Sequence, residues 1–214
     1  MKVFRAETLH DLDYDEIVAL LLGGGIIGFP TDTAYGLGCD PFNEGAVDRL
    51  FRLKGRPETK PILLVIDSLA MAESLSQPSE MFHAVAKKFW PGPLTVVLDA
   101  KPAVPASVTA GTGTVGLRWP VAPIATSLLK RFGKPITATS ANRTGQPSAI
   151  TADEIRSQLG EGLDAIVDDG SLPVRGGSTL LDITADPPLL LREGPISYET
   201  LQTFFNGRIR RQVA

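Results

Sequence analysis

The stretch Ile26-Ile27-Gly28-Phe29-Pro30-Thr31-Asp32-Thr33-Ala34-Tyr35-Gly36-Leu37-Gly38 joins a short apolar run to a polar, glycine-rich segment. Its first four residues predict a buried β-strand, and residues 30–38 predict a loop at the carboxyl end of that strand. Loops in this position are where α/β proteins bind ligands. The alternative is a plain turn whose Thr and Asp side chains cap their own backbone. The glycine spacing of the Rossmann and Walker phosphate loops is missing, which excludes both of those mechanisms.

On both sides of this stretch, apolar runs of strand length alternate with amphipathic stretches of helix length. The pattern predicts further strands at residues 61–66, 94–98, 114–119, 136–139, 165–167, 180–183 and 189–191. It predicts helices at residues 13–22, 79–90, 122–131, 152–159 and 198–206, and one more that begins after Asn43. Strand 94–98 and the strands after Leu163 lack helices between them. We therefore expect an α/β fold with a twisted, mixed parallel and antiparallel open sheet flanked by helices.

Length and composition limit the class of protein. The 214 residues suit one sizeable core, so we expect one domain over residues 9–197, then a C-terminal helix and basic tail at 198–214 with no second domain. The net charge of −3 argues against a protein that coats nucleic acid non-specifically, but it leaves room for a local basic groove. The single cysteine, Cys39, rules out an internal disulfide, and we expect it to pack rather than to react. No apolar run would span a bilayer and no signal peptide is visible, so we expect a cytoplasmic protein without membrane partners.

Two short strings about ninety residues apart place ligand-capable side chains at positions i and i+2. They are Lys54-Gly55-Arg56 and Ser140-Ala141-Asn142. If the backbone is extended, both side chains of each string point to the same side. Two cations with a hydroxyl and an amide would then form a receptor for phosphates. This predicts nucleotide chemistry without a protein nucleophile. The alternative for Lys54, Arg56 and the nearby Lys60 is a solvated charged loop.

Two arginines lie in or beside apolar strands, where an unpaired charge is costly. Arg118 is inside the strand predicted at residues 114–119, and Arg192 directly follows the one at 189–191. Each needs either a ligand or a structural Asp or Glu partner. No histidine stands in an identifiable position to activate Ser140, and no His, Asp and Glu residues have metal-ligand spacing. We therefore expect no protein-bound metal cluster, and any metal to be Mg²⁺ carried with phosphates.

Six ordered blocks match a known family. They are residues 29–38, 54–57 (Lys-Gly-Arg-Pro), 90–95 (Trp-Pro-Gly-Pro-Leu-Thr), 116–120 (Gly-Leu-Arg-Trp-Pro), 140–142 (Ser-Ala-Asn) and 191–195 (Leu-Arg-Glu-Gly-Pro). From about residue 20 to 196 the chain closely resembles the YrdC/TsaC family of L-threonylcarbamoyl-adenylate synthases. The resemblance implies a YrdC-like twisted open sheet with a large, positively charged concave cavity. It also implies synthesis of threonylcarbamoyl-AMP and pyrophosphate from L-threonine, bicarbonate and ATP. Transferase proteins would then pass the threonylcarbamoyl group to the tRNA adenosine next to the anticodon.

The resemblance also implies roles for individual residues. The family's phosphate-contacting signature, which we take as the catalytic set, falls on Lys54, Arg56, Ser140 and Asn142. Further ATP contacts fall on Thr109, Ser148 and Arg192. The threonine-binding positions fall on Thr31, Tyr35, Arg118 and Ser178. Some relatives have a histidine in the strand after residue 57, but residues 61–66 contain none. Longer relatives carry a second C-terminal domain, and we expect this chain to be the short form.

The chief rival hypothesis is a binding module whose cavity holds double-stranded RNA or a ribosomal RNA precursor without catalysis. The complete pair of signatures favours the enzyme. A carbamoyl-transfer domain of the hydrogenase-maturation type ranks lower, because the zinc-finger-like segments that usually accompany it are absent from the sequence. The tail residues Arg208, Arg210 and Arg211 would be able to touch RNA, but we expect a frayed, solvated end.

Overall fold

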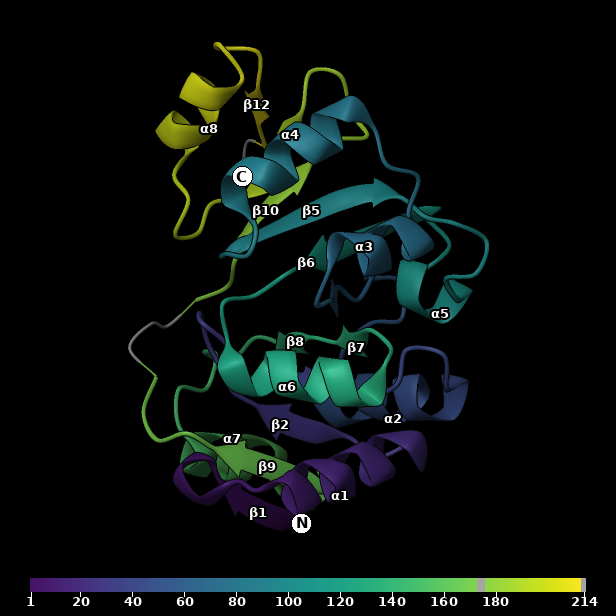
Figure 1. Cartoon of the computed structure of the whole chain (residues 1–214), viewed down its shortest axis with the longest axis vertical. Coiled ribbons are helices and arrows are strands. Elements are labelled where there is room, and N and C mark those ends of the chain that lie inside the picture. The colour runs from purple at the N-terminus through teal and green to yellow at the C-terminus, as the bar shows by residue number, and fades with distance from the viewer. Residues whose placement is uncertain (173–175, 213–214) are drawn as a thin grey trace.

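Two mixed β-sheets organise the computed structural model, which describes residues 1–172 and 176–212 (Figure 1). The five-stranded sheet has the order β1 (Lys2–Arg5), β9 (Ala165–Asp168), β2 (Ile27–Phe29), β3 (Gly36–Gly38), β8 (Thr139–Ser140). The seven-stranded sheet has the order β12 (Arg210–Arg211), β11 (Leu189–Arg192), β10 (Thr179–Asp182), β5 (Leu94–Asp99), β6 (Thr114–Arg118), β4 (Leu64–Val65), β7 (Ile136–Thr137). Both sheets contain parallel and antiparallel pairs. The predicted α/β class with mixed strand directions is confirmed, but the strands divide between two sheets rather than forming one.

Helices cover both sheets. They are α1 (Asp11–Leu22), α2 (Glu44–Lys54), α3 (Leu69–Leu75), α4 (Glu80–Phe89), α5 (Ala106–Thr109), α6 (Pro123–Phe132), α7 (Ala152–Leu159) and α8 (Tyr198–Phe204), with short 3₁₀ turns η1 (Ala6–Thr8) and η2 (Gly160–Gly162). The predicted cap Asn43 is confirmed, because its Oδ1 accepts a hydrogen bond from the Ala46 amide at 3.1 Å. Helix α1 begins two residues earlier than predicted, since Asp13 binds the His10 amide from inside the helix. The sequence analysis places no helix at α3 or α5.

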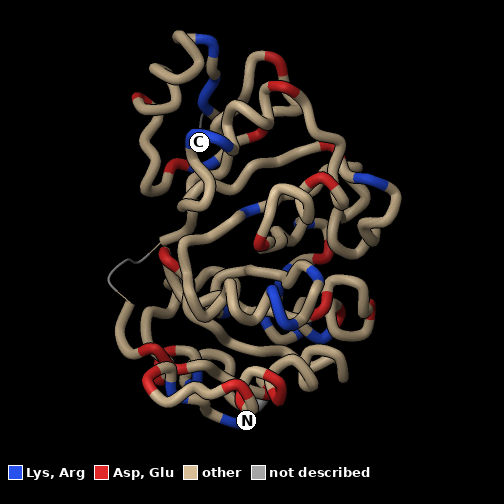
Figure 2. Tube along the Cα trace, in the orientation of Figure 1, with Lys and Arg blue, Asp and Glu red and all other residues tan. Residues whose placement is uncertain are grey.

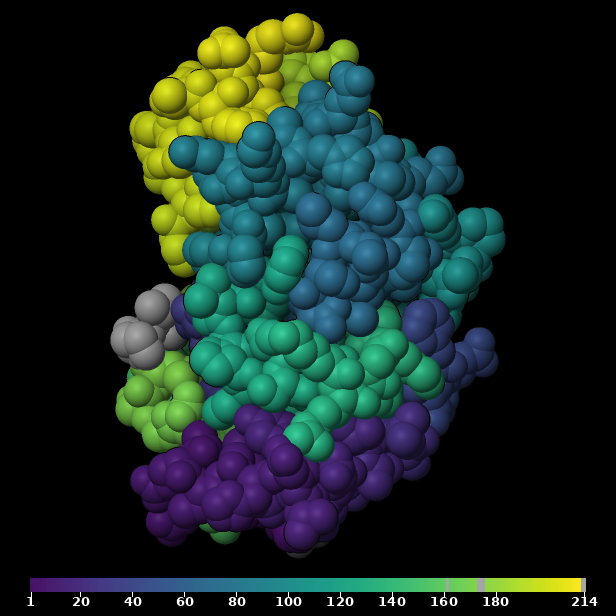
Figure 3. All heavy atoms as spheres, viewed as in Figure 1, coloured from purple at the N-terminus to yellow at the C-terminus, as the bar shows by residue number. Residues whose placement is uncertain are grey.

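The apolar core has three parts, which explain how the helices are placed. Helices α1 and α6 pack on one face of the five-stranded sheet through residues such as Ile17 and Leu128. Helices α2 and α7 pack around Leu37 and Ile166 of the same sheet. Helices α4 and α8 pack on the seven-stranded sheet. Strand β1 with α1 and the C-terminal α8 thus lie at opposite ends of the molecule (Figure 3).

The segment of residues 136–140 belongs to both sheets. Its first part, β7, pairs with β4, and its last part, β8, pairs with β3. Between them, the Thr137 amide donates to the Cys39 carbonyl at 3.1 Å, and the Ala138 amide donates to the Leu63 carbonyl at 3.0 Å. The single strand predicted at residues 136–139 is therefore two short strands that join the sheets.

Strand β3 corrects the prediction that all of residues 30–38 form a loop. Residues 36–38 pair with β2 and residues 36–37 also with β8, and of the three only Leu37 has a side chain to bury. Glycine is needed because a Cβ on Gly38 would lie 2.5 Å from Cγ2 of Ile136 and 2.8 Å from the Phe29 ring. A strand with one side chain in three residues carries no alternation for sequence analysis to detect.

The C-terminal segment also differs from its prediction. Residues 210–211 form β12, which pairs in parallel with β11, and the Gln212 amide donates to the Leu190 carbonyl at 2.9 Å. Ile209 is buried in the same core as Leu201 of α8. The expected frayed tail is therefore wrong for residues 207–212, while 213 and 214 lie outside the described residues. The blue stretches near the C-terminus in Figure 2 are the basic positions of this segment.

Replacing Gly38 with alanine is expected to lower the free energy of unfolding by about 1–3 kcal/mol, because the new methyl group overpacks against Ile136 and Phe29. Gly45→Ala is the matched control. There the new Cβ meets only Oδ1 of Asn43, at 3.5 Å, within helix α2. That variant should be stabilised by up to about 1 kcal/mol. Urea unfolding would measure both variants, and equal midpoints would contradict the close approach at Gly38.

Candidate functional site

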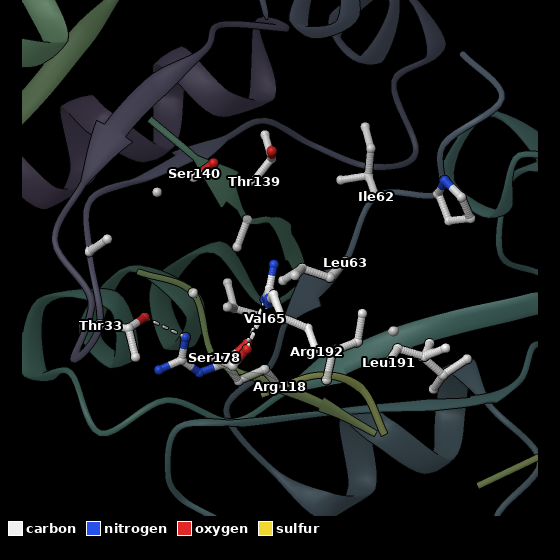
Figure 4. A pocket seen from close by; sticks show the side chains of 18 of the residues that line it. Thr33, Ile62, Leu63, Val65, Arg118, Thr139, Ser140, Ser178, Leu191 and Arg192 are labelled. Carbon is white, nitrogen blue, oxygen red and sulfur yellow. Dashed lines mark hydrogen bonds between the residues drawn. The ribbon is translucent and has the colours of Figure 1, made fainter. Parts of the chain in front are cut away.

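A cavity of about 800 Å³ lies between the two sheets, within the usual size range of ligand sites (Figure 4). One side is formed by the β2–β3 loop, residues 60–63 and residues 138–140. The other side is formed by β6, β10 and β11 with the residues next to them. The described lining side chains include four cations and one carboxylate: Arg56, Lys60, Arg118, Arg192 and Asp182.

Arg118 connects the two sides of the cavity. It leaves β6 of the seven-stranded sheet, and its Nη1 donates to Oγ1 of Thr33 at 2.8 Å in the β2–β3 loop. Its Nη2 pairs with the Asp32 carboxylate, and its Nε donates to the Gly92 carbonyl at 3.2 Å. The side chain is only 6% exposed, so burial lowers its pKa, although the Asp32 charge opposes that shift. The expected need for a partner is met by Asp32, while two of the five guanidinium N–H groups remain available for a ligand.

Arg192 projects into the centre of the cavity (Figure 4). Its Nε and Nη2 donate to the Ser178 carbonyl at 3.1 and 2.8 Å. Among the described residues no carboxylate forms an ion pair with it, and burial followed by the charge of Arg118 lowers its pKa. A Cβ on Gly177 would lie 2.6 Å from the guanidinium carbon, so glycine is required for this placement. The Ser178 hydroxyl shares a hydrogen bond of 2.6 Å with Thr95. A buried Arg118 beside an Arg192 that has no acidic partner among the described residues indicates an anion site.

The β2–β3 loop combines the two roles considered for it. Thr31 caps its own turn, donating to the Ala34 carbonyl at 2.6 Å, and it also lines the cavity. Tyr35 lines the cavity too, but its hydroxyl donates to the Gly170 carbonyl at 2.8 Å and accepts from the Asp169 amide at 2.9 Å. Burial raises the pKa of the Tyr35 phenol to about 12, so it remains a neutral hydrogen-bonding group.

The two signature strings do not have the extended geometry assumed for them. Lys54 ends helix α2, and Gly55 is left-handed with φ 59°. Arg56 lines the cavity and donates to the Pro61 carbonyl at 2.7 Å, and Ser140 lines the cavity from β8. Lys54 instead points into the protein, where Nζ donates to the carbonyls of Ser140 and of Asn142, the latter at 2.7 Å. The expectation that both side chains of each string point to one side is therefore wrong.

Asn142 holds the loop that follows β8. Its Nδ2 donates to the carbonyls of Arg143 at 2.9 Å and Gln146 at 2.6 Å, and the Thr144 amide donates back to the Lys54 carbonyl at 2.9 Å. Lys54 and Asn142 thus hold residues 140–146 in place through hydrogen bonds, but neither of them lines the cavity.

The remaining predicted ATP contacts lie outside the cavity lining. Thr109 is buried in α5, with Oγ1 donating to the Ala106 carbonyl at 3.4 Å. Ser148 is half-buried in the loop before α7. Thr33, Asp182 and Gln212 also line the cavity, and sequence analysis assigned no role to Asp182 or Gln212. Thr33 carried a signal as a further hydroxyl of the polar loop, whereas the other two resemble ordinary strand-end residues.

Two properties of the described residues bear on other chemistry. No three His, Cys, Asp or Glu residues lie together in a way that would hold a metal ion. Burial raises the pKa of the Cys39 thiol to about 11, which fits a packed residue and not a nucleophile. None of the described helices is both long and apolar enough to cross a membrane.

Comparisons with known proteins agree with this geometry. Residues 19–194 match the Sua5/YciO/YrdC family, whose description is "Telomere recombination". The threonylcarbamoyl-AMP synthase of Pyrococcus abyssi is 39% identical over 188 residues, which cover 87% of this chain and 55% of that protein. The Bacillus subtilis protein of the same name is 38% identical over 197 residues, 91% of this chain and 57% of that protein. This chain thus spans little more than half the length of these relatives. The structure of P. abyssi Sua5 complexed with L-threonine aligns with a TM-score of 0.92 at 35% identity, covering 99% of this chain and 62% of that one.

The stability that Lys54 contributes is expected to rise with pH. Burial, and secondly the charge of Arg56, lower the pKa of Lys54 to about 7, whereas an unfolded lysine has a pKa of about 10.4. Between these values the unfolded chain binds one proton more than the native protein, so raising the pH favours the native state. Relative to Lys54→Met, the wild-type free energy of unfolding should increase by about 1–2 kcal/mol from about pH 7 to about pH 8.5, and this increase should be lost as the pH falls back to 7. Urea unfolding of both proteins measures the difference. A constant difference would mean that Lys54 stays charged in the native state.

Proposed function

Since this chain belongs to the Sua5/YciO/YrdC family, we propose that its cavity forms threonylcarbamoyl-AMP and pyrophosphate from L-threonine, bicarbonate and ATP. The observation that carries the proposal is the set of cavity arginines. Arg56 and Arg192 donate only to uncharged groups among the described residues, and Arg118 keeps free N–H groups beside them. The names of the relatives and the threonine-bound neighbour support the choice of substrates.

In this proposal the phosphates of ATP bind at Arg56 and Arg192, with the Ser140 hydroxyl fixing their orientation. Mg²⁺ enters with ATP as part of the substrate. Lys54 and Asn142 act through the 140–146 loop, which they hold in place for Ser140. Thr109 and Ser148 contact ATP only if the nucleotide extends beyond the cavity lining.

Threonine binds at the other side of the arginine cluster. The free N–H groups of Arg118 take its carboxylate, and Thr31, Tyr35 and Ser178 surround it. Some relatives have a histidine in the strand after residue 57. In this chain residues 61–66 contain none, and the side chains that line the cavity from this stretch, Val65 among them, are apolar. One methyl group distinguishes threonine from serine by only about 1–3 kcal/mol, so selectivity depends on reading the hydroxyl group too.

The reaction needs positioning and charge neutralisation rather than a protein nucleophile. The threonine amine adds to CO₂ supplied by bicarbonate and loses a proton, which gives an N-carboxylate. A carboxylate oxygen then attacks the α-phosphorus of ATP in line, the bond to the β-phosphate oxygen breaks, and pyrophosphate leaves. Arg56 and Arg192 stabilise the charge that develops on the phosphate oxygens.

The product is a mixed anhydride, so it requires an acceptor. We propose that tRNA threonylcarbamoyl-transferase proteins take it up in the cytoplasm, where ATP and tRNA are both present. Binding of RNA by the same cavity is the rival, and it would compete with ATP for the arginines.

The activity is tested by incubating the protein with ATP, Mg²⁺ and labelled bicarbonate, with and without L-threonine. We expect label to enter an adenylate only when threonine is present, with one pyrophosphate released for each adenylate. A folded protein that binds RNA in a salt-sensitive manner but forms no adenylate would favour the binding module instead.

Arg56→Ala should lower kcat/KM for adenylate formation by at least about 100-fold, equivalent to about 2.7 kcal/mol, because a phosphate contact is lost. Arg52→Ala is the matched control, since Arg52 is exposed in the last turn of α2, shortly before Arg56, and lies outside the cavity lining. It should retain wild-type kinetics. Near-normal turnover by Arg56→Ala would remove Arg56 from the phosphate site.

A further inference from the structure

The cavity continues past the arginines along one face of the seven-stranded sheet. β10 and the residue before it contribute Ser178, Leu180 and Asp182, every second residue, as the alternation of a strand requires. At about 3.3 Å per residue, Asp182 lies about 13 Å along the strand from Ser178. The cavity therefore has an arginine end near Ser178 and a separate end near Asp182.

The floor between these two ends is apolar. It is formed by Val97 of β5, Leu180 of β10 and Leu191 of β11, and Val97 pairs in register with Gly116 of β6 and Asp182 of β10. Gly116 has no side chain of its own, and Leu63 and Thr95 lie against it, each 3.4 Å from where a Cβ would stand. Leu191 is labelled beside this region in Figure 4, away from Thr33 and Arg118. Such a surface suits a planar, weakly polar ring better than a phosphate.

Asp182 is the one acidic residue in the described lining of the cavity. Its Oδ1 accepts hydrogen bonds from the Thr184 amide at 2.9 Å and from the Thr184 hydroxyl at 2.7 Å. No donor among the described residues contacts Oδ2. An ionised carboxylate oxygen only accepts hydrogen bonds, so Asp182 can select a ligand that presents a donor at this end.

We propose that Asp182 reads the base of the bound nucleotide by accepting a hydrogen bond from the exocyclic amino group of adenine, with the ring lying on Val97, Leu180 and Leu191. The inference rests on the proposed function, which places ATP in this cavity with its phosphates at the arginine end. Adenine carries an amino donor where hypoxanthine and guanine carry a carbonyl oxygen. In the same pose hypoxanthine and guanine set a carbonyl oxygen against Oδ2, acceptor against acceptor, and they can offer their N1–H donor only by shifting along the lining, so the site favours adenine. Asp182 is thus a specificity-determining residue for adenine nucleotides.

The test compares binding of the Mg²⁺ complexes of ATP, ITP and 2′-deoxy-ATP by equilibrium dialysis without threonine. Wild-type protein should bind ATP at least about 100-fold more tightly than ITP. Asp182→Asn keeps an oxygen for Thr184 and gains an N–H donor toward the base, so the ATP-to-ITP preference should fall about tenfold or more. The matched control is Asp99→Asn, because Asp99 lies two residues beyond Val97 on β5, is exposed, and is absent from the cavity lining. It should keep the wild-type preference, and urea unfolding midpoints would establish that both variants fold.

An unchanged ATP-to-ITP preference in Asp182→Asn would overturn the proposal. A change confined to the preference between ATP and 2′-deoxy-ATP would also overturn it, because the carboxylate would then contact the ribose. Binding and product formation are separate measurements. Base-selective ATP binding without threonine-dependent adenylate would contradict the proposed reaction and leave the base reading intact.

Discussion

The short segment of residues 136–140 is the constraint on which the molecule depends, because it forms hydrogen bonds to both sheets within five residues. It enters as a strand of one sheet and leaves as a strand of the other, so the two sheets are held at a set separation. The close approach of Gly38 to Ile136 allows no side chain between them. The cavity is the space that this arrangement leaves on the other side of the crossing, and Ser140 stands at its edge.

The arginines of the cavity differ in whether a carboxylate neutralises them. Arg118 is neutralised by Asp32 and hydrogen-bonded to Thr33, so it ties the β2–β3 loop to the opposite sheet. Arg56 and Arg192 donate only to uncharged groups among the described residues, and burial lowers the pKa of both. Burying cations without counter-charges costs stability, and a protein retains such groups where a ligand supplies the missing charge. By the same reasoning, Asp182 at the far end of the cavity selects a part of the ligand that carries a hydrogen-bond donor.

Much of the fold could be predicted from sequence because most elements carry strong local signals. Asn43 and the apolar positions of α2 predict that helix, and the apolar run before Arg118 predicts β6. Strand β3 has one side chain in three residues and gives no such signal, so β3 and the division into two sheets were missed. Arg118 could be identified as a buried cation needing a partner. Its partner, Asp32, lies 86 residues away in the chain, which is a tertiary property. The direction of Lys54 was mispredicted for a related reason, since the left-handed Gly55 turns the chain between it and Arg56.

A crystal structure with L-threonine and a non-hydrolysable ATP analogue would test the central claim most directly. We expect both ligands in the cavity between the sheets. The threonine carboxylate should lie within hydrogen-bond distance of Arg118, and the phosphates should contact Arg56, Arg192 and Ser140. Phosphates bound outside this cavity, or a threonine carboxylate away from Arg118, would contradict the assignment of the site.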